Sequence, residues 1–219
     1  MKAKIILDFL SELKENNNRD WFQANKAKYE EAKESMLFLL QNLLEELSAF
    51  DKDLGALDAK QCLFRIYRDV RFSMNKQPYK NNMGGFIAVG GRKGGNAGYY
   101  LHIEPGNSFV GGGLYRPEPK ILKAVRDEIN YTGQEFISII ENKDFKHYFP
   151  ELLGESLVRP PKGYDPDSAF IELLKMKSFT VLKSLDDTDL LQDNLIEYLM
   201  PIFKKMQPFN AYLNKAISH

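Results

Sequence analysis

Apolar residues in the first fifty positions recur every three or four residues, which is the spacing of one helix face. The pattern predicts a helix that ends before the polar turn at residues 16–18 and a second helix over residues 19–49. Charged residues fill the opposite side of both segments. We therefore expect these two helices to cover a sheet and to carry no site of their own.

The period changes to two in the middle of the chain, as in a strand whose side chains alternate between two faces. Four segments have this alternation or the short apolar run of a buried strand: residues 64–72, 86–89, 99–104 and 108–112. The glycine-rich segment 90–98 and the Pro-Gly-Asn turn at 105–107 connect the last three of them. Because strands joined by such short turns lie side by side, we expect these three to be antiparallel neighbours.

Helical spacing returns in the last third of the chain. Further helices are predicted over residues 120–130, 134–142, 168–176, 187–206 and 208–217. Helices, then antiparallel strands, then helices define an α+β fold, here a mostly antiparallel sheet of about four or more strands covered by N-terminal and C-terminal helices. No low-complexity linker divides the chain, so residues 1–219 are expected to form a single domain.

The composition narrows the class of protein. Thirty basic and thirty acidic residues give no net charge, which argues against a surface that binds nucleic acid over its whole extent. The single cysteine, Cys62, excludes an internal disulfide, and none of the three histidines has a partner at metal-ligand spacing. The first residues lack the long apolar run of a signal or membrane segment. We expect a cytoplasmic protein with no membrane partner, no metal and no cofactor.

One stretch departs from this neutral background. Residues 60–80 contain six basic side chains and one acid, Asp69, a net charge of +5, so the rest of the chain carries −5. An excess of cations at one place favours an anionic ligand, and the planar fork of arginine suits phosphate or carboxylate. The alternative is a structural patch whose charge is closed by acids from the flanking helices.

The period-two pattern adds chemical groups to this cationic stretch. It places one set of side chains on one face of their segment, namely Arg65, Tyr67, Asp69 and Arg71, and a second set on one face of another segment, namely Tyr100, His102 and Glu104. An anionic small molecule is the expected partner. The residues expected to bind it are Arg65, Arg68, Arg71, Lys76, Tyr79, Lys80, His102, Arg116 and Lys177. His102 is the candidate general acid or base, with Asp69 or Glu104 to orient it. Catalysis stays open, because no activated nucleophile is visible.

Two glycine-rich segments are similar to phosphate-binding loops without matching them. In residues 111–116, Arg116 stands where a dinucleotide fingerprint has its third glycine. In residues 90–98, Asn96 and Ala97 stand where a P-loop has Lys and Ser or Thr. Neither segment therefore supports a nucleotide-binding motif.

Several blocks of the chain together resemble one known family. The longest is FRIYRDVRF at residues 64–72, followed by KQPYK at 76–80, and the others lie at 17–22, 99–104, 111–118, 160–165 and 175–179. In this order they resemble the bacterial and fungal family catalogued as domain of unknown function 2461. The resemblance implies one domain over the full chain and supplies no activity. Asn75 and Gln77 depart from the family, which commonly has Asp at the first position and Thr or Ser at the second.

Two further functions remain open beside the binding of an anionic small molecule. Basic residues interleaved with aromatic ones also suit nucleic acid, because cations meet its backbone and rings stack on its bases. A protein-interaction domain would use the same arginines to dock an acidic segment of a partner. The sequence thus predicts where a site lies and leaves its ligand among these classes.

Overall fold

The computed structural model describes residues 2–218, and its N-terminal part is helical. The first helices are α1 (Lys2–Glu15), α2 (Arg19–Ala24) and α3 (Lys26–Phe50). The single helix predicted over residues 19–49 is therefore two helices, which separate at Asn25. α2 begins after Asn18, whose side-chain oxygen accepts a hydrogen bond from the Trp21 N–H at 2.9 Å.

Four strands form one antiparallel sheet in the order β1-β2-β3-β4. Their bounds are β1 (Met83–Ile87), β2 (Gly98–Ile103), β3 (Ser108–Leu114) and β4 (Phe179–Leu185). The strands predicted near residues 86–89, 99–104 and 108–112 are confirmed as β1, β2 and β3, and β1 begins three residues earlier than predicted. The sequence pattern does not predict β4, which pairs with β3 along its whole length.

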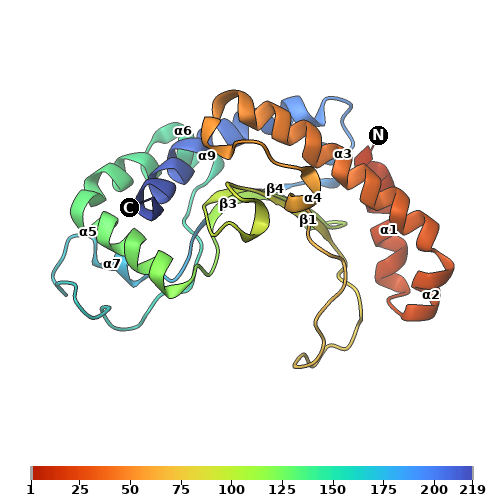
Figure 1. Ribbon diagram of the computed structural model, residues 1–219, viewed down its shortest axis with the longest axis horizontal. Helices are drawn as coiled ribbons and strands as arrows, with labels where there is room; N and C mark the ends of the chain where they lie inside the picture. The colour runs from red at the N-terminus through yellow and green to blue at the C-terminus, as the bar shows by residue number, and fades with distance from the viewer. Residues whose placement is uncertain (1, 219) are drawn as a thin grey trace.

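Helices from both ends of the chain cover the same face of this sheet (Figure 1). α3 lies against β1, and α9 (Leu195–Ile217) lies against β3. Glycines allow the close approach, since a Cβ on Gly85 would lie 2.3 Å from the Leu40 side chain of α3. A Cβ on Gly112 would lie 2.2 Å from Met206 Sδ of α9. The predicted α+β fold and its helical cover are confirmed.

The other helices are shorter or kinked. Their bounds are α4 (Ala59–Cys62), α5 (Pro119–Ile140), α6 (Lys143–Tyr148), α7 (Ile171–Lys175) and α8 (Asp187–Leu190), with 3-10 turns η1 (Lys52–Leu54) and η2 (Gly91–Lys93). The two helices predicted over residues 120–130 and 134–142 are one helix, α5, with a kink at Thr132. No helix within residues 2–218 has the combined length and apolarity that crossing a bilayer requires.

The helix prediction near the C-terminus is wrong because it ends a helix before a proline. A break is predicted before Pro208, yet α9 runs through both Pro201 and Pro208. Proline removes a helical hydrogen bond, but α9 buries a long apolar face that includes Phe203 and Phe209, and this packing offsets the loss. The break lies earlier, between α8 and α9.

Between α4 and β1 the chain forms a protruding arm, residues 63–82 (Figure 1). Its two sides meet through the isolated bridge between Tyr67 and Tyr79. The Lys80 N–H donates to the Ile66 carbonyl at 2.8 Å, so the two sides run antiparallel close to the sheet. The arm therefore starts as an extension of β1 and continues away from the body of the molecule.

The strand predicted over residues 64–72 is wrong, although the segment is extended near its start. The Arg68 N–H donates to the Pro78 carbonyl at 2.9 Å, and Pro78 has no N–H to return the bond. The ladder of hydrogen bonds therefore ends after one bridge. Alternating polarity describes an extended backbone, and only a continuing partner turns it into a strand.

Candidate functional site

The sheet face opposite α3 and α9 carries a band of aromatic side chains. Tyr99 points to the covered face, where its ring meets Phe203 of α9 at 5.6 Å. Because side chains alternate along a strand, Tyr100 and His102 lie on the opposite face. There the His102 ring stacks on Phe109 of β3, with centroids 4.5 Å apart and planes 15° from parallel. We call this the open face, and it is the floor of the candidate site.

Tyr100, His102 and Glu104 form a hydrogen-bonded relay on the open face. The Tyr100 hydroxyl lies 3.0 Å from His102 Nδ1, and His102 Nε2 lies 3.1 Å from Glu104 Oε2. Asn107 also donates to Glu104 Oε2, at 3.3 Å, and helps to fix the carboxylate. The spacing of two residues, which puts all three on one side of β2, makes the relay possible.

Burial decides the protonation of this relay. It lowers the pKa of His102, although the hydrogen bond to Glu104 opposes the shift. It also raises the pKa of Tyr100 to about 12, with a further contribution from the Glu104 charge. At neutral pH the imidazole is therefore neutral. The consistent assignment has the Tyr100 hydroxyl donating to Nδ1 and the Nε2–H donating to Glu104.

Gly84 of β1 makes room for the end of the relay. It pairs with His102 across the sheet, and a Cβ at this position would lie 2.5 Å from the Tyr100 hydroxyl oxygen. Any side chain at residue 84 would displace that hydroxyl. The missing side chain leaves the reactive end of the relay beside bare backbone.

One cation of the arm, Lys80, lies beside this relay, and a second, Arg65, lies near Lys80. Lys80 Nζ lies 5.6 Å from the centre of the Phe64 ring, which meets the Tyr100 ring edge-on at 6.0 Å. Within residues 2–218 no ion pair forms at Lys80 or at Arg65. Burial, and then the charge of Arg65, lower the pKa of Lys80. Lys80 is thus a half-buried cation beside the relay with its charge unmet.

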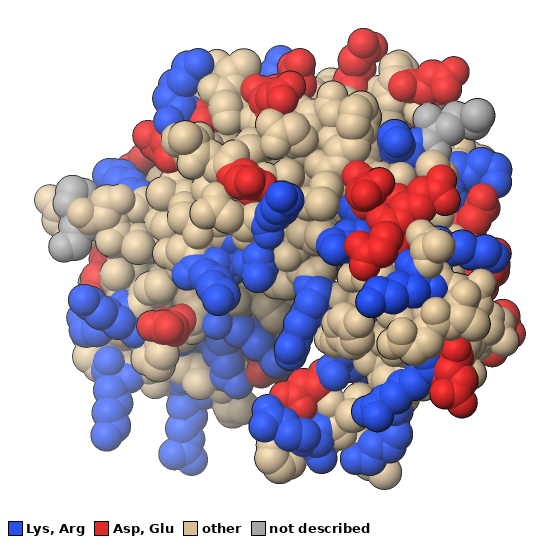
Figure 2. Space-filling model, turned by 45° about the vertical axis from the view of Figure 1, so that its right-hand side comes forward, with Lys and Arg blue, Asp and Glu red and all other residues tan. Residues whose placement is uncertain are grey.

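The molecular surface also has a region where basic side chains are concentrated. Figure 2 shows Lys and Arg side chains around a hollow in the lower half of the molecule, with some Asp and Glu side chains among them and further Asp and Glu side chains higher up. Cations held around a concave surface raise the local concentration of anions there.

The predicted cations farther along the arm form hydrogen bonds within the arm and do not extend toward the relay. Arg71 donates to both carboxylate oxygens of Asp69, at 2.9 and 2.7 Å. Lys76 donates to the Val70 carbonyl at 3.1 Å, and Arg68 lies 3.4 Å from the Ser73 hydroxyl. Asp69 is therefore paired at the tip of the arm, and it is Glu104 that contacts His102.

Tyr79 holds the arm in place. Its ring is buried and stacks on Phe22 of α2, with centroids 4.0 Å apart and planes 11° from parallel. Asn17 clamps the same residue, accepting from the Tyr79 N–H at 3.1 Å and donating to the Tyr79 carbonyl at 3.1 Å. The polar run that ends α1 thus fixes the root of the arm, and the Tyr79 ring faces the core instead of a ligand.

Arg116 and Lys177 lie together, away from the relay. Both bind the Glu155 carboxylate, Arg116 at 3.1 Å and Lys177 at 3.2 Å. Phe109, which stacks on His102, is the second residue of β3, whereas Arg116 follows the far end of that strand, about 20 Å away along it. The nine predicted residues therefore divide into three groups: the arm root with the open face, the arm tip, and this pair.

The sequence placed Tyr100 on the same face as His102, but Tyr100 was not among the predicted binding or catalytic residues. Its signal was present, since Tyr100 lies two residues before His102 and shares its face. In the described range 2–218 no three His, Cys, Asp or Glu side chains are grouped so that they could hold a metal ion. The site consists of a proton relay, aromatic rings and unpaired cations.

Fold and site together define an α+β protein with a one-sided antiparallel sheet and a cationic arm beside its uncovered face. The chain belongs to the family described as conserved hypothetical protein (DUF2461), whose model matches residues 5–212. This confirms the resemblance seen in the sequence. No curated protein and no solved structure matches the chain.

Proposed function

We propose that the protein binds a phosphorylated or otherwise anionic small molecule on the open face, between the root of the arm and the relay. The observation that carries this proposal is Lys80, a half-buried ammonium with no acid partner among the described residues. Burying an unpaired charge is costly unless a counter-charge arrives. A bound anion supplies that counter-charge and also relieves the repulsion between Lys80 and Arg65.

The rings of the open face favour a ligand with a planar or apolar part. Phe64, Tyr100 and Phe109 are each partly exposed and contact one another through Tyr100. Aromatic faces bind rings by stacking, and they bind apolar groups by burial. An anionic group at Lys80 with its organic part on these rings would use both features of the surface.

The relay gives this site a means of moving a proton. If a group of the ligand meets the Tyr100 hydroxyl, the hydroxyl can pass its proton to His102 Nδ1 while the phenol oxygen takes a proton from the ligand, and the Glu104 carboxylate stabilises the imidazolium that forms. Catalysis in the proposal is limited to this proton transfer, because the relay is the acid–base element that the described residues of the open face supply.

The test is a comparison of two lysines of the arm. Lys80→Met and Lys76→Met each remove one charge, but only Lys80 lies beside the relay. Thermal shifts and titrations with inorganic phosphate and adenosine monophosphate, against sodium chloride at equal ionic strength, should show binding to wild type. Lys80→Met should weaken it roughly ten-fold, the effect of one charge-assisted contact. Lys76→Met should bind like wild type.

Equal binding by both variants would remove the proposal, as would the absence of any response of wild type beyond the salt control. Loss of folding cannot imitate the expected result, because replacing an unpaired half-buried cation by methionine should hold or raise stability.

One observation favours nucleic acid as a second candidate. Phe72 and Met74 at the arm tip are 97% and 100% exposed, beside Arg68, Arg71 and Lys76. Apolar wedges flanked by cations suit insertion between bases. Oligonucleotide binding that weakens steeply with salt, and that Lys76→Met reduces while Lys80→Met does not, would support this function instead. A flat titration at low salt would exclude it.

A further inference from the structure

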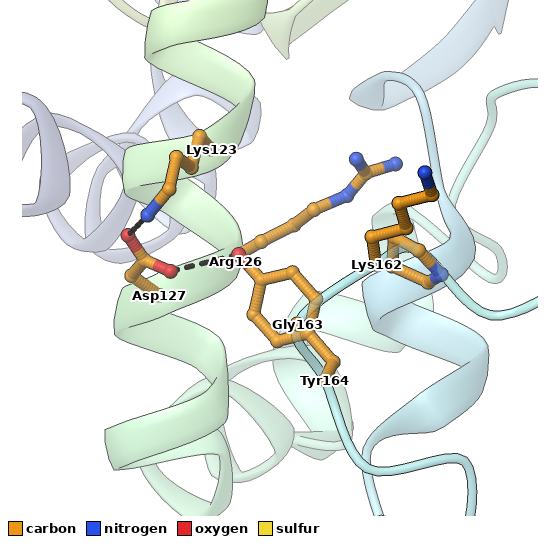
Figure 3. Close-up of a pocket in the computed structure, with 7 residues that line it drawn as sticks. Lys123, Arg126, Asp127, Lys162, Gly163 and Tyr164 are labelled. Atoms are coloured by element: carbon orange, nitrogen blue, oxygen red, sulfur yellow. Dashed lines mark hydrogen bonds and ion pairs between the residues drawn. The ribbon is translucent and has the colours of Figure 1, made fainter.

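A separate cationic pocket lies between α5 and the loop that precedes α7. It has a volume of about 230 Å³. Lys123, Arg126 and Asp127 of α5 line one side, and Lys162 and Tyr164 of the loop line the other (Figure 3). None of these residues belongs to the open face or to the arm, so the pocket is a site separate from the open face.

The acid of this pocket is already fully engaged. Asp127 Oδ2 accepts from Lys123 Nζ at 2.5 Å, and Asp127 Oδ1 accepts from the Tyr164 hydroxyl at 2.7 Å. These two bonds lower the pKa of Asp127 against the effect of burial, so it is a carboxylate at neutral pH. Both of its oxygens thus face partners other than Arg126.

Arg126 has a charge that no acid within residues 2–218 neutralises. One terminal nitrogen, Nη2, donates to the Met176 carbonyl at 2.9 Å. Its Nε is buried and has no hydrogen-bond partner among the described residues. Burial lowers the pKa of Arg126, yet a guanidinium stays protonated in a protein. A carbonyl satisfies one donor and leaves the positive charge uncompensated.

Lys162 brings to the same space a second cation, which forms no ion pair in the described part of the chain. Figure 3 shows its ammonium and the Arg126 guanidinium pointing toward one another across the pocket. Gly163 follows with φ +90°, a left-handed conformation that favours glycine, and Tyr164 then anchors the loop to Asp127. The turn therefore holds Lys162 opposite Arg126, where two like charges repel each other unless an anion lies between them.

From this geometry we infer that the pocket binds the phosphate group of a phosphomonoester between Arg126 and Lys162. Three cationic side chains face one carboxylate, and the excess of two positive charges matches a phosphate dianion. The cavity is larger than a phosphate group, which leaves room for a small organic substituent. Free inorganic phosphate would bind the same cations, so the relative affinities for inorganic phosphate and for a phosphomonoester distinguish these two ligands.

The experiment titrates the full chain with inorganic phosphate and with phenyl phosphate at pH 7.5, followed by calorimetry and by amide chemical shifts. Sodium chloride at equal ionic strength is the blank. The variants are Arg126→Met and Lys162→Met. Lys26→Met is the control, because Lys26 is an exposed lysine at the start of α3, outside the pocket.

Wild type and Lys26→Met should bind alike, and each pocket variant should weaken binding roughly ten-fold or more. Shifts should concentrate on α5 and on residues 160–164. Tighter binding of phenyl phosphate assigns the pocket to an ester, and equal or weaker binding assigns it to free phosphate. Affinity should also fall between pH 7.5 and pH 5, where phosphate loses its second charge.

Equal binding by wild type and both pocket variants overturns the inference. The absence of binding by wild type at phosphate concentrations up to about 10 mM also overturns it. Arg126→Met should keep the fold, since it removes an uncompensated charge. If it does not, Lys162→Met decides alone, because Lys162 is exposed. Lys80→Met should leave the phosphate-induced shifts of α5 and residues 160–164 unchanged, so failure of the open-face proposal is seen separately.

Discussion

His102 is buried, stacked on Phe109 and hydrogen-bonded at both ring nitrogens. Burial favours the neutral ring and outweighs the opposing effect of Glu104, so the pKa of His102 lies below the ordinary value of about 6.5. Its environment therefore fixes the direction of the relay, with Tyr100 donating and Glu104 accepting. A residue in this state makes stability depend on pH.

We predict that His102 lowers stability in acid. The unfolded chain takes up a proton near pH 6.5, and the folded chain takes it up only at lower pH, so protonation favours unfolding. The free energy of unfolding should fall as the pH drops from 7.5 through 6.5, by at most about 1.4 kcal/mol per pH unit from this one group. Urea denaturation at several pH values measures the slope.

The variants separate His102 from the other titrating groups. His102→Gln should flatten the slope between pH 7 and pH 5.5, whereas His147→Gln, a change at an exposed position on α6, should not. A wild-type slope that survives in His102→Gln would contradict the prediction. Proton titration of the His102 ring by NMR gives an independent value.

Single residues show what a sequence can and cannot disclose. Alternation along β2 predicted that His102 and Glu104 share a face, and the structure agrees. The sequence does not indicate that the charge of Arg126 is available to a ligand, because this depends on Asp127 being bonded to Lys123 and Tyr164. Pairing decides whether a charge is spare, and pairing between distant segments is a property of the fold.

At the scale of elements, the arm depends on contacts made by a helix end. Asn17 follows α1 and binds both the N–H and the carbonyl of Tyr79, 62 residues away. It also donates to the Asn81 side chain at 2.8 Å. These bonds replace the ladder that Pro78 prevents, and they position Lys80 between the two clamped residues.

We predict that Asn17→Ala loosens the arm. The lost bonds should cost about 1–3 kcal/mol, because the backbone groups of the buried Tyr79 would be left unsatisfied. Hydrogen exchange should quicken at residues 79–82, and denaturation should show the loss of stability. Asn16→Ala is the matched control, since Asn16 bonds only locally to the Glu12 carbonyl. Equal effects of the two changes would argue against the clamp.

Elements also show where pattern reasoning succeeds and fails. The three strands joined by glycine-rich and Pro-Gly-Asn turns were predicted, because local turn chemistry reports local pairing. β4 was not predicted: Phe179, Val181 and Leu185 follow a period of two, but Lys183 interrupts their apolar alternation. The segment 64–72 alternates like a strand, but its ladder ends after one bridge because Pro78 in the facing segment has no N–H to continue it.

At the scale of the whole molecule, one sheet face is covered and the other carries the candidate site. Buried side chains of α1, α3, α5, α9 and the strands belong to one connected core cluster. The polar side chains of the arm tip bond within the arm. The core therefore does not depend on the tip.

We predict that replacing residues 69–77 by Asn-Gly leaves the fold intact. A two-residue turn can join Arg68 to Pro78, which already share a hydrogen bond. The free energy of unfolding should change by less than about 1 kcal/mol, because Phe72 and Met74 are exposed. A loss of several kcal/mol would show that the tip packs on the body. Anion binding should persist, and any oligonucleotide binding should disappear.

The stack of Tyr79 on Phe22 has a practical consequence. The chain has a single tryptophan, Trp21, which directly precedes Phe22 and lies 6.2 Å from Phe9 between ring centres. Its emission comes from the aromatic cluster on which the arm is mounted. Lys80 directly follows Tyr79 in the chain. A ligand that binds Lys80 should therefore change the environment of this cluster. The protein thus carries its own fluorescent probe of the arm root, and no label is needed to follow events there.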